Sequence, residues 1–184
     1  MGELIWNDNS LDSLSRPVLV VAFKGLFDAS GSATAALEWL MEKSESENLG
    51  EIDSETFFDF TQERPLIGFD ENGERVLSWP KNKIVAIKTH EDQRDILAIS
   101  GIEPHLRWRT FSDLLIEIVR KSNVESVLTL GSMVGMTPHS RPLTVTGSST
   151  NLELAKRLNL EKPSYQGPTG IVGVLHDALD SAKI

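Results

Sequence analysis

Continuous apolar runs of strand length recur along this 184-residue chain. The three clearest are Val18–Phe23, Lys83–Lys88 and Val127–Leu130. The first two hold β-branched residues and show no strict alternation with polar positions, which is typical of strands buried on both faces of a sheet. The pattern therefore predicts strands at all three places, the first two as buried strands.

Apolar residues recur at helical spacing in three other segments. They predict helices over Ser32 to about Lys43, over roughly Arg107–Lys121, and from Ile171 to the C-terminus. The predicted strands and helices alternate along the chain, and this order indicates an α/β layer structure.

A hairpin is predicted between two short extended runs, Pro65–Phe69 and Glu74–Trp79. The residues that separate them include Asn72-Gly73, and both tolerate the positive φ that tight hairpin turns require. We expect this hairpin to be appended to the main sheet, within an insertion that spans residues 49–80. The aromatic residues of the insertion fit a small core or an oligomer contact better than a ligand site.

Less regular stretches complete the prediction. Residues 1–16 should be loosely ordered, Ser44–Asn48 should form a solvated turn, and Leu143–Gly147 alternates enough to predict a strand. Thr150 and Glu153 form a capping box, which predicts a short helix behind them. With no linker and no repeat, residues 1–184 are predicted to form a single domain, a size that buries roughly 70% of the unfolded surface.

The amino-acid composition excludes several classes of function. The net charge of −9 opposes non-specific binding to nucleic acid, and the absence of cysteine excludes thiol catalysis, thiolate metal sites and disulfides. No segment has the length and apolarity of a signal peptide or a membrane span. We therefore expect a cytoplasmic protein that binds neither nucleic acid nor membrane and needs no cofactor or metal.

The segment Val124–Arg141 carries the first candidate site, because an apolar strand there gives way to a glycine-rich polar loop. In α/β proteins such loops are where ligands and partners usually meet the sheet. Its candidate binding residues are Gly131, Ser132, Gly135, His139 and Arg141. Arg141 suits either a salt bridge across a subunit interface or an anionic ligand. His139 suits either a hydrogen bond that organises the loop or acid–base chemistry.

A second glycine-rich turn precedes the last helix. Its candidate residues are Gly167, Thr169 and Gly170. Free amides at a helix start can hold an anion, although most such amides bind water. We expect this turn and the loop from Gly131 to Arg141 to meet at one edge of the sheet.

Specific catalytic signatures are missing from both segments. Gly131–Gly135 is not followed by the Gly-Lys-Ser/Thr of a nucleotide-binding loop, and no Gly-x-Ser-x-Gly elbow supports a serine triad. The histidines are too widely spaced for a recognisable metal motif, and His90-Glu91-Asp92 is better interpreted as a polar strand end. No catalytic residue is predicted.

Several motifs together are similar to the proteasome assembly chaperone 2 family in its actinobacterial form. In the C-terminal half they are Gly131–Pro142, Val145-Thr146-Gly147 and Tyr165–Ile171. Upstream they are Phe58-Asp59-Phe60, Arg64-Pro65 and Leu77–Pro80. The resemblance covers most of the chain from about Val18 onward.

This resemblance implies a three-layer α/β/α fold of the phosphorylase/hydrolase-like kind with a mixed sheet. It also implies homo-oligomers, with a trimer favoured, and an assembly chaperone with proteasome α-subunits as its partners. The chain ends Ala182-Lys183-Ile184 rather than in the hydrophobic-Tyr-any tripeptide that such chaperones use on the proteasome ring. It also ends sooner after Gly170 than family members usually do, so we expect apolar surface for a partner subunit to cover.

Two hypotheses from different classes follow. The favoured one is a non-catalytic protein-binding or assembly-chaperone-like protein. The alternative is a nucleotide- or phosphate-binding enzyme, which the two glycine-rich turns, His139 and Arg141 would serve.

Overall fold

The computed structural model describes residues 3–7, 14–89, 94–160 and 164–184. The chain divides into two compact units, one made of Met1–Met133 with Gly170–Ile184 and the other of Val134–Thr169. We describe each unit by itself. The prediction of a single domain over the whole chain therefore stays a prediction.

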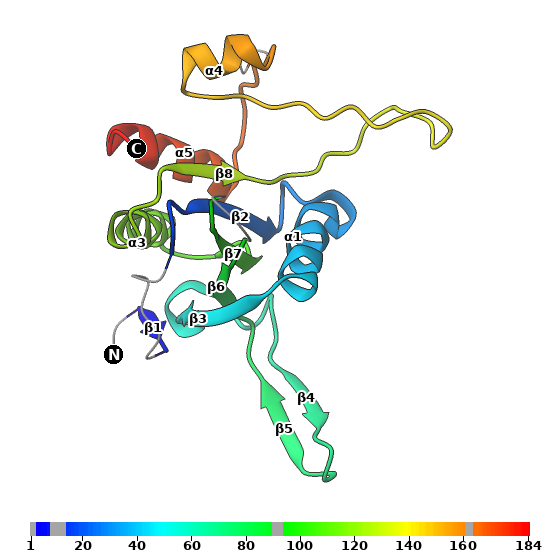
Figure 1. Ribbon diagram of the computed structural model, residues 1–184. Helices are drawn as coiled ribbons and strands as arrows, with labels where there is room; N and C mark the ends of the chain where they lie inside the picture. The colour runs from blue at the N-terminus through cyan, green and yellow to red at the C-terminus, as the bar shows by residue number, and fades with distance from the viewer. Residues whose placement is uncertain (1–2, 8–13, 90–93, 161–163) are drawn as a thin grey trace. The chain divides into compact units, whose positions relative to one another are not determined.

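A six-stranded sheet is the centre of the first unit (Figure 1). In spatial order its strands are β1 (Leu4–Trp6), β3 (Ser46–Ile52), β6 (Asn82–Ile87), β7 (Ile96–Ile102), β2 (Val18–Lys24) and β8 (Ser126–Thr129). β2 runs parallel to β7 and β8, whereas the β1–β3, β3–β6 and β6–β7 pairs are antiparallel. The sheet is mixed, as predicted.

Helices cover both faces of this sheet (Figure 1). Helix α1 (Ser32–Lys43) places Leu37 against Val20 and Ala22 of β2, on one face. Helices α3 (Trp108–Lys121) and α5 (Ile171–Ser181) lie with Leu19 and Val21 on the other face. Because successive side chains of a strand point to opposite faces, the alternation along β2 produces three layers, α/β/α.

The larger core lies between the sheet and helices α3 and α5. Phe111 of α3 is fully buried and contacts Phe23 and Phe57 edge to face, at centroid distances of 5.5 and 5.2 Å. Phe57 ends the short helix α2 (Ser54–Phe57), so this cluster fixes the start of the long insertion against α3. Burying each such ring contributes on the order of 2 kcal/mol.

The predicted hairpin is present. Strands β4 (Leu66–Phe69) and β5 (Arg75–Ser78) pair antiparallel, with Phe69 opposite Arg75 across the turn that contains Gly73. The hairpin is an addition to the main sheet, as predicted, and its two strands form a separate two-stranded sheet. At its base Trp79 contacts Phe60 at a centroid distance of 4.8 Å.

Three strands were not predicted. β1 lies within the residues expected to be loosely ordered, β3 begins in the expected solvated turn, and β7 lies where no element was predicted. The register of β3 shifts between Asn48 and Gly50, so its buried and exposed residues do not alternate regularly along the strand. The interpretation of His90-Glu91-Asp92 lies outside the described residues.

The second unit holds one helix, α4 (Leu152–Arg157), among its described residues. Its N-cap is Asn151, whose Oδ1 accepts hydrogen bonds from the amides of Glu153 and Leu154 at 3.0 Å each. The predicted capping box at Thr150 was therefore displaced by one residue. Leu143–Gly147, predicted as a strand, is assigned no strand in the structure. Throughout the described part of the chain, no helix is long and apolar enough to cross a membrane.

Asp95 fixes the amino end of β7, and its ionisation makes the stability of the fold depend on acid pH. Its side chain is buried and accepts hydrogen bonds from the amides of Ser15 and Thr89 and from Lys88 Nζ, at 2.8, 3.1 and 3.1 Å. Burial alone would raise the pKa of Asp95, but these hydrogen bonds outweigh it and hold the pKa below its ordinary value of 3.8.

A carboxylate whose pKa is lower in the folded state stabilises the fold above its unfolded pKa, and this contribution is lost as the pH falls through the folded value. We therefore expect the unfolding free energy of the wild type to fall more steeply below pH 3.8 than that of Asp95→Asn. Urea titrations across that range measure the difference. The exposed Asp113→Asn is the control and should follow the wild-type profile; equal slopes for all three proteins would contradict the assignment.

Candidate functional site at the carboxyl edge of the sheet

The parallel strands β2, β7 and β8 end at the same edge of the sheet, and the loops that follow them diverge there. The loop after β2 leads to α1 on one face, and the loop after β7 leads to α3 on the other face. In open α/β sheets, this change of direction opens a crevice where ligands and partners bind. The loops at this edge therefore form the candidate site.

Glu103, directly after β7, joins three segments at this edge. Its Oε2 accepts a hydrogen bond from the amide of Leu26 at 3.0 Å, and its Oε1 accepts one from the amide of Ile171 at 2.7 Å. The second bond places a carboxylate on the first turn of α5, where the helix dipole favours negative charge. The anion position that the sequence suggested at this helix start is thus filled by the chain itself.

Glycines on both sides leave room for the Glu103 carboxylate. A Cβ atom at Gly25 would lie 2.3 Å from Glu103 Oε2, and one at Gly170 would lie 2.6 Å from Oε1. Both distances are too short for real contacts. The glycine requirement at Gly170 therefore arises from an internal carboxylate, and a phosphate at this position would have to displace Glu103.

Asp28 makes the corresponding connection between the β2 loop, α1 and the end of β8. It is buried, and its Oδ1 accepts hydrogen bonds from the amide of Ala33 at 2.8 Å and from Ser132 Oγ at 3.3 Å. Thr34 Oγ1 donates to its Oδ2. The backbone adds two bonds, because the amide of Ser132 donates to Phe27 and the amide of Ala29 donates to Ser132. The start of α1 is therefore tied to the residues after β8.

Three of the sequence-predicted site residues come together around Phe27. Ser132 bonds its backbone, a Cβ at Gly131 would lie 3.2 Å from its carbonyl oxygen, and one at Gly170 would lie 3.2 Å from its ring. The segments before Val134 and after Thr169 thus meet at one edge of the sheet.

The other predicted site residues belong to the second unit, and all are exposed: Gly135, His139, Arg141, Gly167 and Thr169. Within that unit, the amide of Arg141 donates to the carbonyl of Pro138, and Tyr165 Oη donates to the carbonyl of Pro168 at 2.8 Å. Their participation in one binding site stays a prediction.

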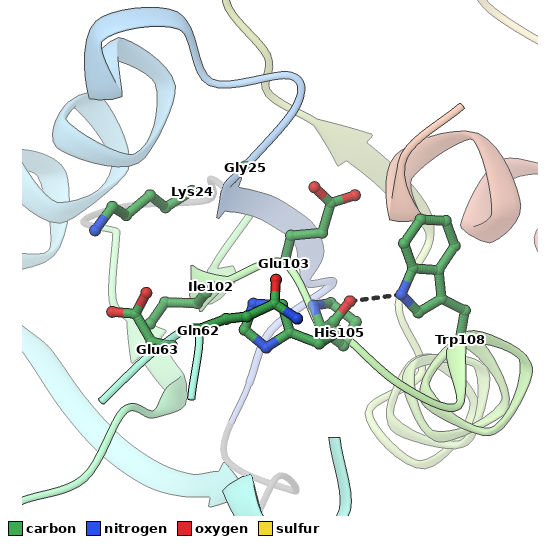
Figure 2. A pocket seen from close by; sticks show the side chains of 9 residues that line it. Lys24, Gly25, Gln62, Glu63, Ile102, Glu103, His105 and Trp108 are labelled. Atoms are coloured by element: carbon green, nitrogen blue, oxygen red, sulfur yellow. Dashed lines mark hydrogen bonds between the residues drawn. The ribbon is translucent and has the colours of Figure 1, made fainter. Parts of the chain in front are cut away.

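A pocket of about 390 Å³ opens beside Glu103 (Figure 2). Lys24 comes from the end of β2 and His105 from the β7–α3 connection. Trp108 is the first residue of α3, and Gln62 and Glu63 come from the loop that follows α2. Figure 2 shows Lys24 and Glu63 on one side of the pocket and Trp108 on the other. None of these residues was predicted from the sequence, because they come from three separated segments without a shared motif.

The polar groups around this pocket are engaged within the chain. His105 Nδ1 accepts a hydrogen bond from the amide of Asp59 at 3.1 Å, so a neutral ring carries its proton on Nε2. Trp108 Nε1 donates to the carbonyl of Pro104 (Figure 2). Hydrogen bonds from Thr61 and Gln62 lower the pKa of Asp59 to about 2. These bonds shape the loops and assemble no nucleophile with a base.

The charges around this pocket disfavour an anionic ligand. Two carboxylates, Glu63 and Glu103, face the pocket with one ammonium, Lys24. Among the described residues no cluster of three histidines or acids could hold a metal ion.

His176 lies within α5, and its Nε2 is 2.9 Å from Thr129 Oγ1. The pKa of His176 is lowered because its ring is partly desolvated.

Comparison with known proteins places this architecture in a family. The model of the PAC2 family matches residues 22–184. The chain belongs to the PAC2 family. A PAC2 family protein from Streptomyces avermitilis is 37% identical, with a TM-score of 0.86, over 91% of this chain and 72% of that one. A comparison with functionally curated proteins finds no match.

Two further solved structures similar to this chain are homologues of proteasome-assembly chaperones. A proteasome-assembly chaperone homologue from Mycobacterium tuberculosis is 36% identical, with a TM-score of 0.82, over 91% of this chain and 71% of that one. Pyrococcus furiosus PbaA, an archaeal homologue of proteasome-assembly chaperone, is 17% identical, with a TM-score of 0.57, over 92% of this chain and 69% of that one. The archaeal likeness shows a shared fold alone.

Proposed function

We propose that this PAC2 protein is a non-catalytic, assembly-chaperone-like protein of the cytoplasm that binds proteasome α-subunits. The observation that carries the proposal is the 36% identity to the Mycobacterium tuberculosis proteasome-assembly chaperone homologue over 91% of the chain. The site agrees with it, because the charged and polar groups of the edge hold loops together and no catalytic set is present among the described residues.

Self-association is part of this proposal. The protein forms a homo-oligomer, with a trimer favoured, and presents the loops of the carboxyl edge to its partner. Apolar side chains support a protein partner, because Leu26 and Met133, which flank the joined loops, are 62% and 73% exposed. Loops often carry binding residues, and exposed apolar surface on them suits a protein partner.

The experiment is native mass spectrometry of the purified protein mixed with purified proteasome α-subunits of the same organism. A complex of defined stoichiometry is expected. Leu26→Asp should weaken the complex at least tenfold, whereas Trp39→Asp, an equally exposed residue on α1, should leave it intact. Absence of any complex at micromolar concentrations would contradict the proposal.

A further inference from the structure

The β4–β5 hairpin exposes apolar residues on both of its faces. Cross-strand partners share a face, so Leu66 and Val76 lie on one face and Ile67, Leu77 and Phe69 on the other. These side chains are exposed by 70%, 42%, 55%, 49% and 75% in that order. A hairpin that projects into water would normally be polar on at least one face.

The hairpin also has two open edges. Among the described strands, β4 and β5 pair only with each other. An isolated two-stranded hairpin is marginally stable in water, and a third strand is what ordinarily completes it. Its turn is acidic, because Asp70, Glu71 and Glu74 precede Arg75. The missing strand should therefore be apolar on alternate positions and accompanied by positive charge.

Residues 142–147 have these properties. Leu143 and Val145 alternate with Thr144 and Thr146, the pattern of a strand, yet the segment is assigned no strand. Leu143 and Val145 are 83% and 96% exposed, and no described residue of Val134–Thr169 is buried. This segment has strand-forming residues without a partner strand.

The hairpin turn and the segment around residues 142–147 carry opposite charges. Residues 134–169 hold four basic and two acidic residues, whereas the whole chain has a net charge of −9. The rest of the chain is therefore strongly negative. Arg141 lies two residues before Leu143, where the apolar alternation begins, and the acidic turn of the hairpin is a complementary surface for it.

We propose that residues 142–147 of one copy add as a strand to an open edge of the β4–β5 hairpin of a second copy. Main-chain hydrogen bonds supply affinity in such strand addition, and the alternating side chains cover the apolar faces. The two surfaces differ, so the contact is heterologous, and in the closed oligomer proposed above it would repeat around the ring. The inference rests on the self-association proposed above and names its interface.

Single-cysteine variants test this interface directly, because the natural chain contains no cysteine. Tagged Val145→Cys is mixed with untagged Ile67→Cys in air, and the disulfide-linked species are separated by mass without reductant. We expect a mixed dimer as the main product, at least fivefold above either homodimer. Trp39→Cys, 61% exposed on α1, replaces Ile67→Cys as the control and should yield no mixed dimer above background.

Other products would overturn the inference in identifiable ways. Homodimers of Ile67→Cys as the main product would mean that hairpins pair with each other. A monomeric internal disulfide in the Val145→Cys, Ile67→Cys double variant would mean that the strand docks within its own chain. An oligomeric wild type by light scattering without a mixed dimer would reject this interface and leave α-subunit binding untouched, whereas a monomeric wild type would reject self-association itself.

Discussion

Glu103→Ala is expected to lower the free energy of unfolding by about 1–3 kcal/mol, mainly the cost of leaving the part-buried amide of Ile171 without an acceptor. The carboxylate accepts the amides of Leu26 and Ile171, so its removal releases the β2 loop and the first turn of α5 together. Loss of negative charge at the helix start adds to the effect. Urea unfolding followed by circular dichroism measures the change.

Two variants isolate the cause. Glu63→Ala removes another carboxylate of the same pocket and should cost less than about 0.5 kcal/mol, as substitutions away from buried partners usually do. Glu103→Gln keeps one acceptor oxygen and should fall between Glu103→Ala and the wild type. Equal stabilities for Glu103→Ala and Glu63→Ala would show that the Glu103 hydrogen bonds contribute nothing to the fold.

Asp28→Ala is expected to cost about 3 kcal/mol, because removal of a buried acceptor strands several donors at once. The amides of Ala33 and Thr34 at the start of α1 lose their side-chain acceptor, and Ser132 loses a link to the β2 loop. Differential scanning calorimetry should show a lower midpoint with an unchanged two-state profile.

Two milder substitutions show how much of the stability cost of Asp28→Ala comes from individual hydrogen bonds. Ser132→Ala deletes a single donor and should cost about 1 kcal/mol, the value of one ordinary hydrogen bond. Asp28→Asn retains the Oδ1 acceptor, so it should be milder than Asp28→Ala. A larger loss for Ser132→Ala than for Asp28→Ala would contradict the view that Asp28 is the centre of this network.

The sequence predicts best the elements whose periodicity is long and uninterrupted. The strands β2, β6 and β8 and the helices α1, α3 and α5 fall where the apolar pattern places them. β7 was missed although its apolar run Ile96–Ile99 is as long as Val127–Leu130, and Ser100 and Gly101 follow that run. The structure explains Gly101, since a Cβ there would lie 1.9 Å from Asn82 Oδ1, the acceptor of the Ile102 amide.

The hydrogen bonds of the candidate site could not be predicted from the sequence, because their partners lie far apart in the chain. Glu103 acts on Leu26 and Ile171, and Asp28 acts on Ser132, across large separations in the chain. Lone acids in loops carry no local signature of such partners. The glycines beside them did carry a signal, and Gly131 and Gly170 were predicted as site residues because small residues cluster there.

Assembly chaperoning is the central claim, and the most direct measurement is the time course of proteasome assembly from purified α- and β-subunits on native gels. With an equimolar amount of this protein, we expect assembly intermediates to mature at least threefold faster and the protein to be absent from the finished particle. Leu26→Asp should remove the acceleration, and Trp39→Asp should retain it. Identical time courses with and without the protein would contradict the claim.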